Sequence, residues 1–400
     1  MVNPAIEPPD SLRALNRQRI LGALREIGPA TRADLTGYTK LSRTTVTSIL
    51  DDLASEELIT ARNSPHRGPG GGSGRPPAVF SIAALSGVVA ALDLGHSHIR
   101  VAVADLSGSI QAELHEPIDV DVSAESAIEV ATTMLAAAMR KADAENELPR
   151  QIVMGIPGPL DRESGAVGST SILPGWVDLV PAAELERRMG SPVIVDNDAN
   201  LGAAGEVAFG AGRGFDDVVY VKISTGIGAG LILGGRIYRG SAGIAGEIGH
   251  VPVQEDGVVC RCGNRGCLET VSSAPALLTM LQPAHPESLS IADIARLATG
   301  GDLGAIRVLS DAGRTVGRVV ADLVNNLNPA AVIIGGDLSL AGDTVVDGLA
   351  ESIHRYAQPA AATSAHITRG ALGLRAEILG GIAVAVQMAT RQHPAAAFTA

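Results

Sequence analysis

The sequence lacks the marks of an exported or membrane-embedded protein. It contains no apolar run of about 18 residues, the length that a membrane-spanning helix requires, and no basic and then apolar leader. Cysteine is also scarce, with three residues in 400. These absences predict a cytoplasmic protein without a disulfide framework, whose thiols either bind a metal or stay free.

Lysine is nearly as rare, at 3 of the 31 basic residues, which we attribute to coding bias. The net charge of −12 argues against a protein that binds nucleic acid over its whole surface. The charge is uneven, however: residues 1–80 carry 10 basic and 8 acidic side chains, against 21 and 35 in the remainder. A mildly basic head on an acidic body of this length predicts two or three domains with separate roles.

The first part of the sequence predicts three helices. The segment SLRALNRQRILGALREIG places an apolar stripe on one side and ends at Gly28. A shorter helix, TRADLTGY, precedes the turn TKL, and Ser42 is then a candidate N-cap for a third helix. The apolar residues that should face inward are Leu15, Ile20, Leu21, Leu24, Val46, Ile49, Leu50 and Leu53.

The outward face of the third helix predicts a helix-turn-helix contact with DNA. Arginine can bond guanine, and hydroxyl side chains can reach base edges or phosphates. A three-helix packing module with a solvated face is the alternative. The strand LITARN and the Gly/Pro-rich stretch after it favour DNA binding, because they predict a wing with a basic tip. The candidate DNA-binding residues are Ser42, Arg43, Thr44, Thr47, Arg67 and Arg75.

Two later stretches predict a duplicated α/β fold with a cleft between its halves. GVVAALDLGHSHIRVAVADLSG and, further on, DVVYVKISTGIGAGLILGGRIYRG each read as two strands around a glycine-rich turn. Such turns expose backbone N–H groups that can hold phosphate, although many plain hairpins need them too.

Between these stretches, VIVDNDANLGAAGE predicts a buried strand that ends in polar side chains. Asn197, Asp198 and Asn200 lie at the junction with a helix, where clefts place polar groups against small ligands. An aspartate there can act as a general base, and both residue types can bond sugar hydroxyls. Helix capping is the plain alternative, above all for Asn200. The single tryptophan, Trp176, is expected to pack near the cleft mouth.

All three cysteines lie within eight positions, and this spacing predicts a metal site. Three thiolates and one imidazole satisfy tetrahedral zinc and leave no open position, so the predicted ion is structural, one per chain. Three unrelated buried thiols are the alternative, which leaves their clustering unexplained. The metal would fix the positions of Glu247 and Glu269, which lie on either side of the cysteine loop and are candidates for binding a polyol. The predicted ligands are His250, Cys260, Cys262 and Cys267.

Together, these motifs resemble the ROK family (repressors, open reading frames and sugar kinases). GIPGPLD, DNDANLGAAGE, STGIGAG, GEIGH and CRCGNRGCLE carry the resemblance, and with the head the whole chain resembles ROK transcriptional repressors. The resemblance implies an actin-like ATPase fold of two RNase H-like lobes. In the family kinases, the aspartate that matches Asp198 activates the sugar hydroxyl, and the residues that match the cluster above hold zinc. The residues that match sugar contacts are Asn197, Asp198, Glu247, His250 and Glu269.

The domain boundaries follow from the motifs and the resemblance. We predict a winged helix-turn-helix domain over residues 1–62, and a wing tip and linker over 63–85. The first lobe should cover 86–197 and the second 198–400, with the C-terminal helix returning to the first lobe.

The chain departs from the family pattern in its phosphate loops. Family kinases carry a DxGGTK-like loop, whereas this chain reads DLGHSH, so that histidines and a serine stand at three of its positions. Ser224 replaces a usual glycine in the second loop, and Asp337 takes a place where a small residue suits adenosine. Because phosphoryl transfer depends on positioning ATP and metal, these changes predict lost catalysis and retained sugar binding. The substituted positions are His96, Ser97 and His98, and the remnants of the loops are Asp93, Gly95, Thr225, Gly226 and Gly228.

The sequence therefore predicts a non-enzymatic, sugar-responsive repressor that reads an inverted repeat as a dimer or tetramer. Its predicted effector is a monosaccharide or a derivative of one. An active ATP-dependent sugar kinase that also binds DNA, with Asp198 as its base, is the alternative from another class. An activator under the same ligand control also fits the sequence.

Overall fold

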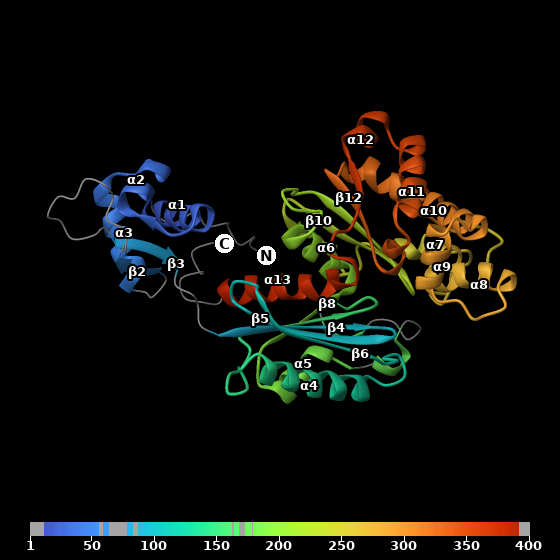
Figure 1. Ribbon diagram of the computed structural model, residues 1–400, viewed down its shortest axis with the longest axis horizontal. Coiled ribbons are helices and arrows are strands. Elements are labelled where there is room, and N and C mark those ends of the chain that lie inside the picture. The colour runs from blue at the N-terminus through green and yellow to red at the C-terminus, as the bar shows by residue number, and fades with distance from the viewer. Residues whose placement is uncertain are drawn as a thin grey trace, which may run out of the picture. The chain divides into compact units, whose positions relative to one another are not determined.

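The computed structural model describes residues 12–55, 59–63, 78–82, 87–161, 164–167, 173–177 and 179–391. The chain divides into two compact units, Met1–Gly87 with Met388–Ala400 and Val88–Gln387 (Figure 1). We call the described residues from 12 to 82 the head, and Val88–Gln387 the body. None of the described helices is long and apolar enough to cross a membrane.

Three helices form the head, as the sequence predicts: α1 (Leu12–Ile27), α2 (Arg32–Thr39) and α3 (Arg43–Ser55). Gly28 ends α1 with a φ of +74°, a conformation that favours glycine. The Ser42 hydroxyl caps α3 by accepting the N–H of Thr45 at 3.1 Å. The predicted inward face of α3 is confirmed, because its four apolar residues are buried: Val46, Ile49, Leu50 and Leu53.

A three-stranded antiparallel sheet completes the head, in the order β1 (Ala30–Thr31), β3 (Ala78–Ile82), β2 (Ile59–Asn63). The sequence reading placed residues 63–85 in a wing tip and linker, and β3 corrects that reading. Phe80 pairs with Ala30 and with Ala61, and its side chain is buried in the core of the head. Apolar burial therefore draws this segment into the wing sheet. The predicted tip residues Arg67 and Arg75, and the side chain of Leu15, lie outside the described residues.

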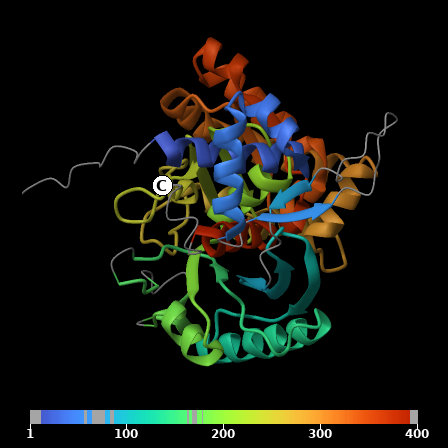
Figure 2. The same cartoon turned by 90° about the vertical axis from the view of Figure 1, so that its left-hand side faces the viewer.

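The first lobe of the body is a five-stranded sheet in the order β6-β5-β4-β7-β8. β4, β5 and β6 are antiparallel, and β7 and β8 run parallel to β4. Helices α4 and α5 lie on one face and α13 on the other (Figures 1 and 2). The elements are β4 (Val88–Gly95), β5 (His98–Asp105), β6 (Ile110–Pro117), α4 (Ala124–Lys141), β7 (Ile152–Ile156), η1 (Pro174–Trp176), α5 (Pro181–Met189) and β8 (Val193–Asn197).

The second lobe repeats this topology, because its strands follow the order β11-β10-β9-β12-β13. β9, β10 and β11 are antiparallel, and β12 and β13 run parallel to β9. The match of order and direction confirms the predicted duplication and its RNase H-like lobes. The strands are β9 (Val218–Ile223), β10 (Ile227–Leu233), β11 (Arg236–Ile237), β12 (Ala331–Gly335) and β13 (His366–Arg369).

Helices pack against the second sheet and build the larger hydrophobic core of the body. Val316 and Leu309 of the long helix α10 are fully buried there together with Leu349 of α11. The helices of this lobe are η2 (Ile248–His250), α7 (Leu268–Ser272), α8 (Ala274–Leu281), η3 (Gln282–Ala284), α9 (Ile291–Thr299), α10 (Leu303–Leu327), η4 (Asp337–Ala341), α11 (Asp343–Tyr356), α12 (Pro359–Ser364) and η5 (Gly373–Arg375).

Two further helices, α6 (Asp198–Phe209) and α13 (Ala376–Arg391), pack against each other between the lobes. Glycine makes their close approach possible, because a Cβ at Gly380 would collide with the carbonyl of Leu201. A Cβ at Gly381 would meet Ala91 of β4 at 2.8 Å, so α13 also packs on the first sheet. This packing brings the N-terminal ends of both helices to the same cleft.

Candidate functional site

A cleft between the two lobes brings together most of the residues that the sequence singled out. It is lined by the β4–β5 turn, the β8–α6 junction, the β9–β10 turn, the segment from Glu247 to Glu269 and the start of α13. All five predicted sugar contacts line it: Asn197, Asp198, Glu247, His250 and Glu269. The five phosphate-loop remnants line it as well: Asp93, Gly95, Thr225, Gly226 and Gly228.

The β8–α6 junction sets the first polar groups of the cleft. Asn197 is the N-cap of α6, and its side-chain oxygen accepts the N–H groups of Ala199 at 2.9 Å and Asn200 at 3.3 Å. Asp198 follows at the first helical position, and its Oδ1 accepts the N–H of Ala199 at 2.7 Å. Capping and exposure to the cleft therefore occur together here, since both side chains also line the cavity.

Asn200 does not belong to the site, which corrects the interpretation that it meets a ligand or caps the helix. It lies inside α6 and is buried, and its amide donates to Asp196 Oδ1 at 3.0 Å. Arg239 holds the other oxygen of Asp196 through its Nε at 3.1 Å. Asn200 thus supports the strand that carries Asn197, and it does not line the cleft.

Trp176 also has a structural place. Its side chain is fully buried in the core of the first lobe, and its indole N–H donates to the carbonyl of Val120 at 2.8 Å. The expected packing role is confirmed, and Trp176 is not among the described residues that line the cleft.

Two charged residues that the sequence reading missed lie at the centre of the cleft. Lys222 of β9 donates to Asp198 Oδ2 at 2.8 Å and lies 3.4 Å from Glu377 Oε1 at the start of α13. Burial lowers the pKa of Lys222, but the nearby carboxylates, Asp198 and Glu377 foremost, more than offset this and raise the pKa overall. One signal was available: Lys222 is one of three lysines in the chain and interrupts the apolar strand VVYVKI.

His98, the first residue of β5, lies beside Gly95 at the β4–β5 turn. His98 Nε2 lies 3.0 Å from Asp93 Oδ2, and a Cβ at Gly95 would collide with the His98 ring. Burial opposes the charge of both groups, but their mutual hydrogen bond raises the pKa of His98 and lowers that of Asp93. The His98 ring therefore fills the space next to Gly95 and bonds the carboxylate of Asp93. His96 turns instead to Asp121, with Nδ1 at 2.7 Å from Oδ1.

The β9–β10 turn is shorter than the motif STGIGAG indicates. Only Ser224–Gly226 form the turn, and Gly228 lies in β10, where a Cβ would make ordinary contact with Ala199. Ser224 Oγ accepts the N–H of Asp337 at 3.0 Å and so ties the turn to the segment after β12. The predicted departures Ser224 and Asp337 thus bond each other.

The segment from Glu247 to Glu269 supplies the opposite wall of the cleft. Glu269 Oε1 accepts Arg261 Nε at 2.8 Å, which holds this carboxylate next to the β9–β10 turn. Burial raises the pKa of Glu247 to about 7, and the like charges of Asp198 and Glu269 act in the same direction. The wall offers acceptor oxygens of the kind that bind sugar hydroxyls.

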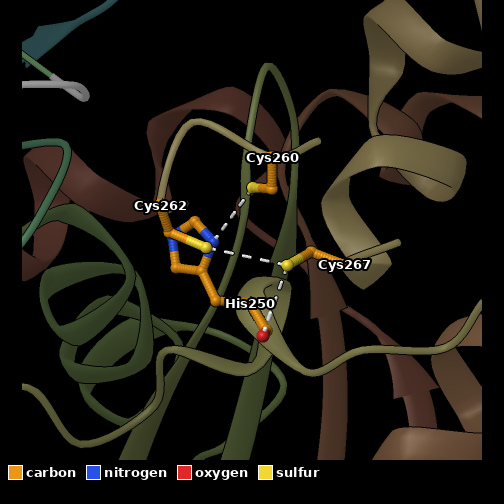
Figure 3. A group of neighbouring side chains, drawn as sticks. All are labelled: His250, Cys260, Cys262 and Cys267. Atoms are coloured by element: carbon orange, nitrogen blue, oxygen red, sulfur yellow. Dashed lines mark hydrogen bonds between the residues drawn. The ribbon is translucent and has the colours of Figure 1, made fainter. Parts of the chain in front are cut away.

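The four predicted metal ligands come together at the base of this segment, as Figure 3 shows. Their donor atoms all lie within 4.8 Å of one another, with Cys260 Sγ 3.5 Å from His250 Nδ1 and Cys262 Sγ 3.7 Å from Cys267 Sγ. A tetrahedral ion with bonds of about 2.3 Å to sulfur requires donors about 3.8 Å apart. The donor set and its spacing therefore fit a metal ion.

His250 lies between this cluster and the cleft wall that carries Glu247 and Glu269. Its Nδ1 faces Cys260, and its Nε2 lies 3.7 Å from Glu247 Oε2. A carboxylate behind a ligating imidazole is the usual second contact at metal sites, because it fixes the ring and its tautomer. The His250 side chain therefore lies between the metal cluster and the Glu247 carboxylate.

The predicted DNA-binding residues of the head differ in their exposure and in their hydrogen bonds. Arg43 and Thr44 are exposed at the start of α3, and Thr47 is half-buried. The Ser42 hydroxyl is already engaged, because it lies 2.8 Å from both Thr44 Oγ1 and Thr45 Oγ1 and caps the helix. Arg43 is therefore the most available of these side chains for a base contact.

The sequence profile of the ROK family matches residues 89–388. A xylose repressor of Bacillus subtilis (strain 168) is 29% identical over 92% of this chain and 94% of its own. A glucokinase of Thermotoga maritima (strain ATCC 43589 / DSM 3109 / JCM 10099 / NBRC 100826 / MSB8) is 32% identical over 73% of this chain and 95% of its own. A solved structure described as a ROK family transcriptional regulator, a homologue of the E. coli MLC protein, has a TM-score of 0.76 at 26% identity, over 94% of this chain and 96% of that one.

Proposed function

This chain belongs to the ROK family, and from that premise we propose that it is a transcriptional repressor whose DNA binding is controlled by a monosaccharide in the cleft. The observation that supports the proposal is a cleft lined by all five predicted sugar contacts, in a chain that also carries a head of three helices and a three-stranded sheet. The relatives with the same span are a repressor and a transcriptional regulator, whereas the glucokinase matches about three quarters of the chain.

The cleft is further proposed to have lost catalysis. Three of its own side chains occupy positions that a phosphoryl transfer site keeps free: His98 covers Gly95, Lys222 bonds Asp198, and Ser224 bonds the segment at Asp337. Positioning of ATP and metal supplies nearly all of the rate in phosphoryl transfer, so these contacts favour binding without turnover. At the opposite wall, Arg261 bonds one carboxylate oxygen of Glu269 and leaves the second oxygen facing the β9–β10 turn.

We expect no sugar-dependent ADP formation from the purified protein with Mg-ATP and a panel of monosaccharides. The reason is the occupation of the phosphate loops by His98 and Ser224. A coupled ADP-release assay measures it, with the Thermotoga maritima glucokinase as the positive control. Turnover of about 1–100 s⁻¹ that Asp198→Asn abolishes would establish the kinase alternative instead.

The metal of the Cys₃His cluster is proposed to be zinc, one per chain. Three thiolates and an imidazole are soft and borderline donors that suit zinc, and four protein ligands leave no position for a reacting water. When bound, the ion acts as a structural clamp. His250, Cys260, Cys262 and Cys267 would hold it, and the chain would thereby fix the wall that carries Glu247 and Glu269.

The head is proposed to read an inverted repeat as part of a dimer or tetramer, since a single short recognition helix contacts only one half-site. We expect Arg43→Ala to weaken binding to a palindromic operator selected from random DNA by about 1–3 kcal/mol, because Arg43 is exposed at the start of α3. Arg19→Ala, an exposed arginine of α1, is the matched control. Fluorescence anisotropy measures both; equal binding by Arg43→Ala and wild type would make the head a packing module.

A further inference from the structure

We propose that Lys222 is a built-in cation that fills the space among the carboxylates of Asp93, Asp198 and Glu377, so that this cleft binds its ligand without a divalent metal ion. The contacts of Lys222 with Asp198 and Glu377 carry the cation site. Only its consequence for the sugar effector rests on the proposed function.

Three carboxylates from distant parts of the chain converge on Lys222. Asp93 lies in β4, Asp198 begins α6 and Glu377 is the second residue of α13. Lys222 Nζ lies 2.8 Å from Asp198 and 3.4 Å from Glu377, and the carboxylate of Asp93 also acts on its charge. Oxygen donors converging from several elements are what Mg²⁺ or Mn²⁺ takes as ligands, and here an ammonium group lies among them.

The surroundings keep this ammonium in place. Asp93 and Glu377 are buried, the Lys222 side chain is 13% exposed, and strand β9 holds Lys222 between the fully buried Val221 and Ile223. Tyr220 reaches around from the same strand, and its hydroxyl donates to Glu377 Oε1 at 3.3 Å. A Cβ at Gly202 or Gly335 would collide with the Tyr220 side chain, so glycine at these two positions leaves the room that the Tyr220 ring requires. Packing of β9 and the Tyr220 hydrogen bond to α13 therefore fix the positions of Lys222 and Glu377.

One oxygen of Asp93 shows that the carboxylates are not fully satisfied by protein groups. Its Oδ2 bonds His98, but its Oδ1 is buried without a hydrogen-bond partner among the described residues. A free buried oxygen costs free energy unless a cation compensates it, and Lys222 and His98 are the cations at hand. A divalent ion entering this space would meet the ammonium of Lys222, and like charges exclude it.

Removal of the ammonium should therefore create a metal site where none exists. We expect Lys222→Met, which keeps an unbranched side chain without charge, to gain one Mn²⁺ per chain in the zinc-loaded protein. Electron paramagnetic resonance of free Mn²⁺ measures the binding, and wild type should bind none in the cleft. Lys141→Met, at the exposed end of α4, is the matched control and should behave like wild type.

Two further variants keep the experiment decisive if Lys222→Met is unstable. Lys222→Met with Asp198→Asn should lose the gained site, which would locate it at these carboxylates. Lys222→Arg keeps the charge and should gain no Mn²⁺. Mn²⁺ should also raise the melting temperature of Lys222→Met but not of wild type, because a ligand that binds only the folded state stabilises it.

The outcomes separate this inference from the proposed function. Mn²⁺ bound by wild type and lost with Asp198→Asn would overturn the built-in cation, as would a Lys222→Met protein that folds but gains no site. Neither result would affect operator binding by the head. For the effector, calorimetric titration of the wild type with its monosaccharide should give the same affinity with and without excess Mg²⁺. An affinity that requires Mg²⁺ would also overturn the inference.

Discussion

Cys262→Ser should remove the metal from the protein and weaken monosaccharide binding by about 100-fold or more, while operator binding persists. The loop that carries the cysteines has little hydrophobic core of its own, because Val258 and Val259 are both 65% exposed. Its only β-pairings in the described chain are isolated bridges such as Val259 with Arg265. Structural zinc contributes about 10–16 kcal/mol to the folding of small metal-held modules, so the loop should not keep its shape without it.

The loss of sugar affinity follows from the residues that the loop positions. Glu247 Oε2 lies 3.7 Å from His250 Nε2, and Glu269 lies in the first turn of α7, two positions after Cys267. Hydrogen bonds to charged groups contribute about 1.5–3 kcal/mol each, so that misplacing both carboxylates costs about 3 kcal/mol or more, about 100-fold in affinity. Elemental analysis gives the zinc content and calorimetry the sugar affinity.

Val258→Ser is the matched control for this experiment, because Val258 is an exposed residue of the same loop that contributes no ligand. It should keep one zinc and normal sugar affinity. Wild-type protein prepared without chelators that contains no metal, or a metal-free Cys262→Ser that binds sugar as well as wild type, would contradict the assignment of the cluster as a clamp.

The parts of the fold that the sequence predicted well are those with local signals. The cap of α3 at Ser42, the end of α1 at Gly28 and the two hairpins depend on residues close in the chain. The metal cluster was predictable for a similar reason, since its three cysteines lie within eight positions and the chain has no others.

The parts that escaped prediction depend on long-range packing. Lys222 meets Glu377 across 155 positions, and neither residue has a neighbour in sequence that reveals the pairing. Phe80 enters the wing sheet because the core of the head buries it, although its segment follows a Gly/Pro-rich stretch that reads as a linker. Gly230 belongs to the motif STGIGAG, but it serves helix packing, because a Cβ there would collide with the carbonyl of Ala199.

Sugar and operator should bind this protein antagonistically, through one conformational equilibrium of the two lobes. Asn197 ends the first sheet, whereas Glu247 and Glu269 stand on the second lobe, so a sugar bonded to both walls favours a closed cleft. In the chain, the head precedes β4 of the first lobe, and residues 83–87 connect them. Closure should therefore change the separation of two heads in an oligomer whose half-sites require a fixed spacing.

The size of the effect is set by the difference in sugar affinity between the open and closed states. Typical couplings are about 1–3 kcal/mol, so saturating sugar should weaken operator binding by about 5- to 150-fold, and operator should weaken sugar binding by the same factor. Glu247→Ala should bind operator normally and ignore the sugar, because its carboxylate lines the cleft and not the head. Glu255→Ala, an exposed carboxylate of the same segment outside the cleft, should respond like wild type. Titrating sugar with and without saturating operator measures the coupling, and equal affinities in the two titrations would mean that the cleft does not control the head.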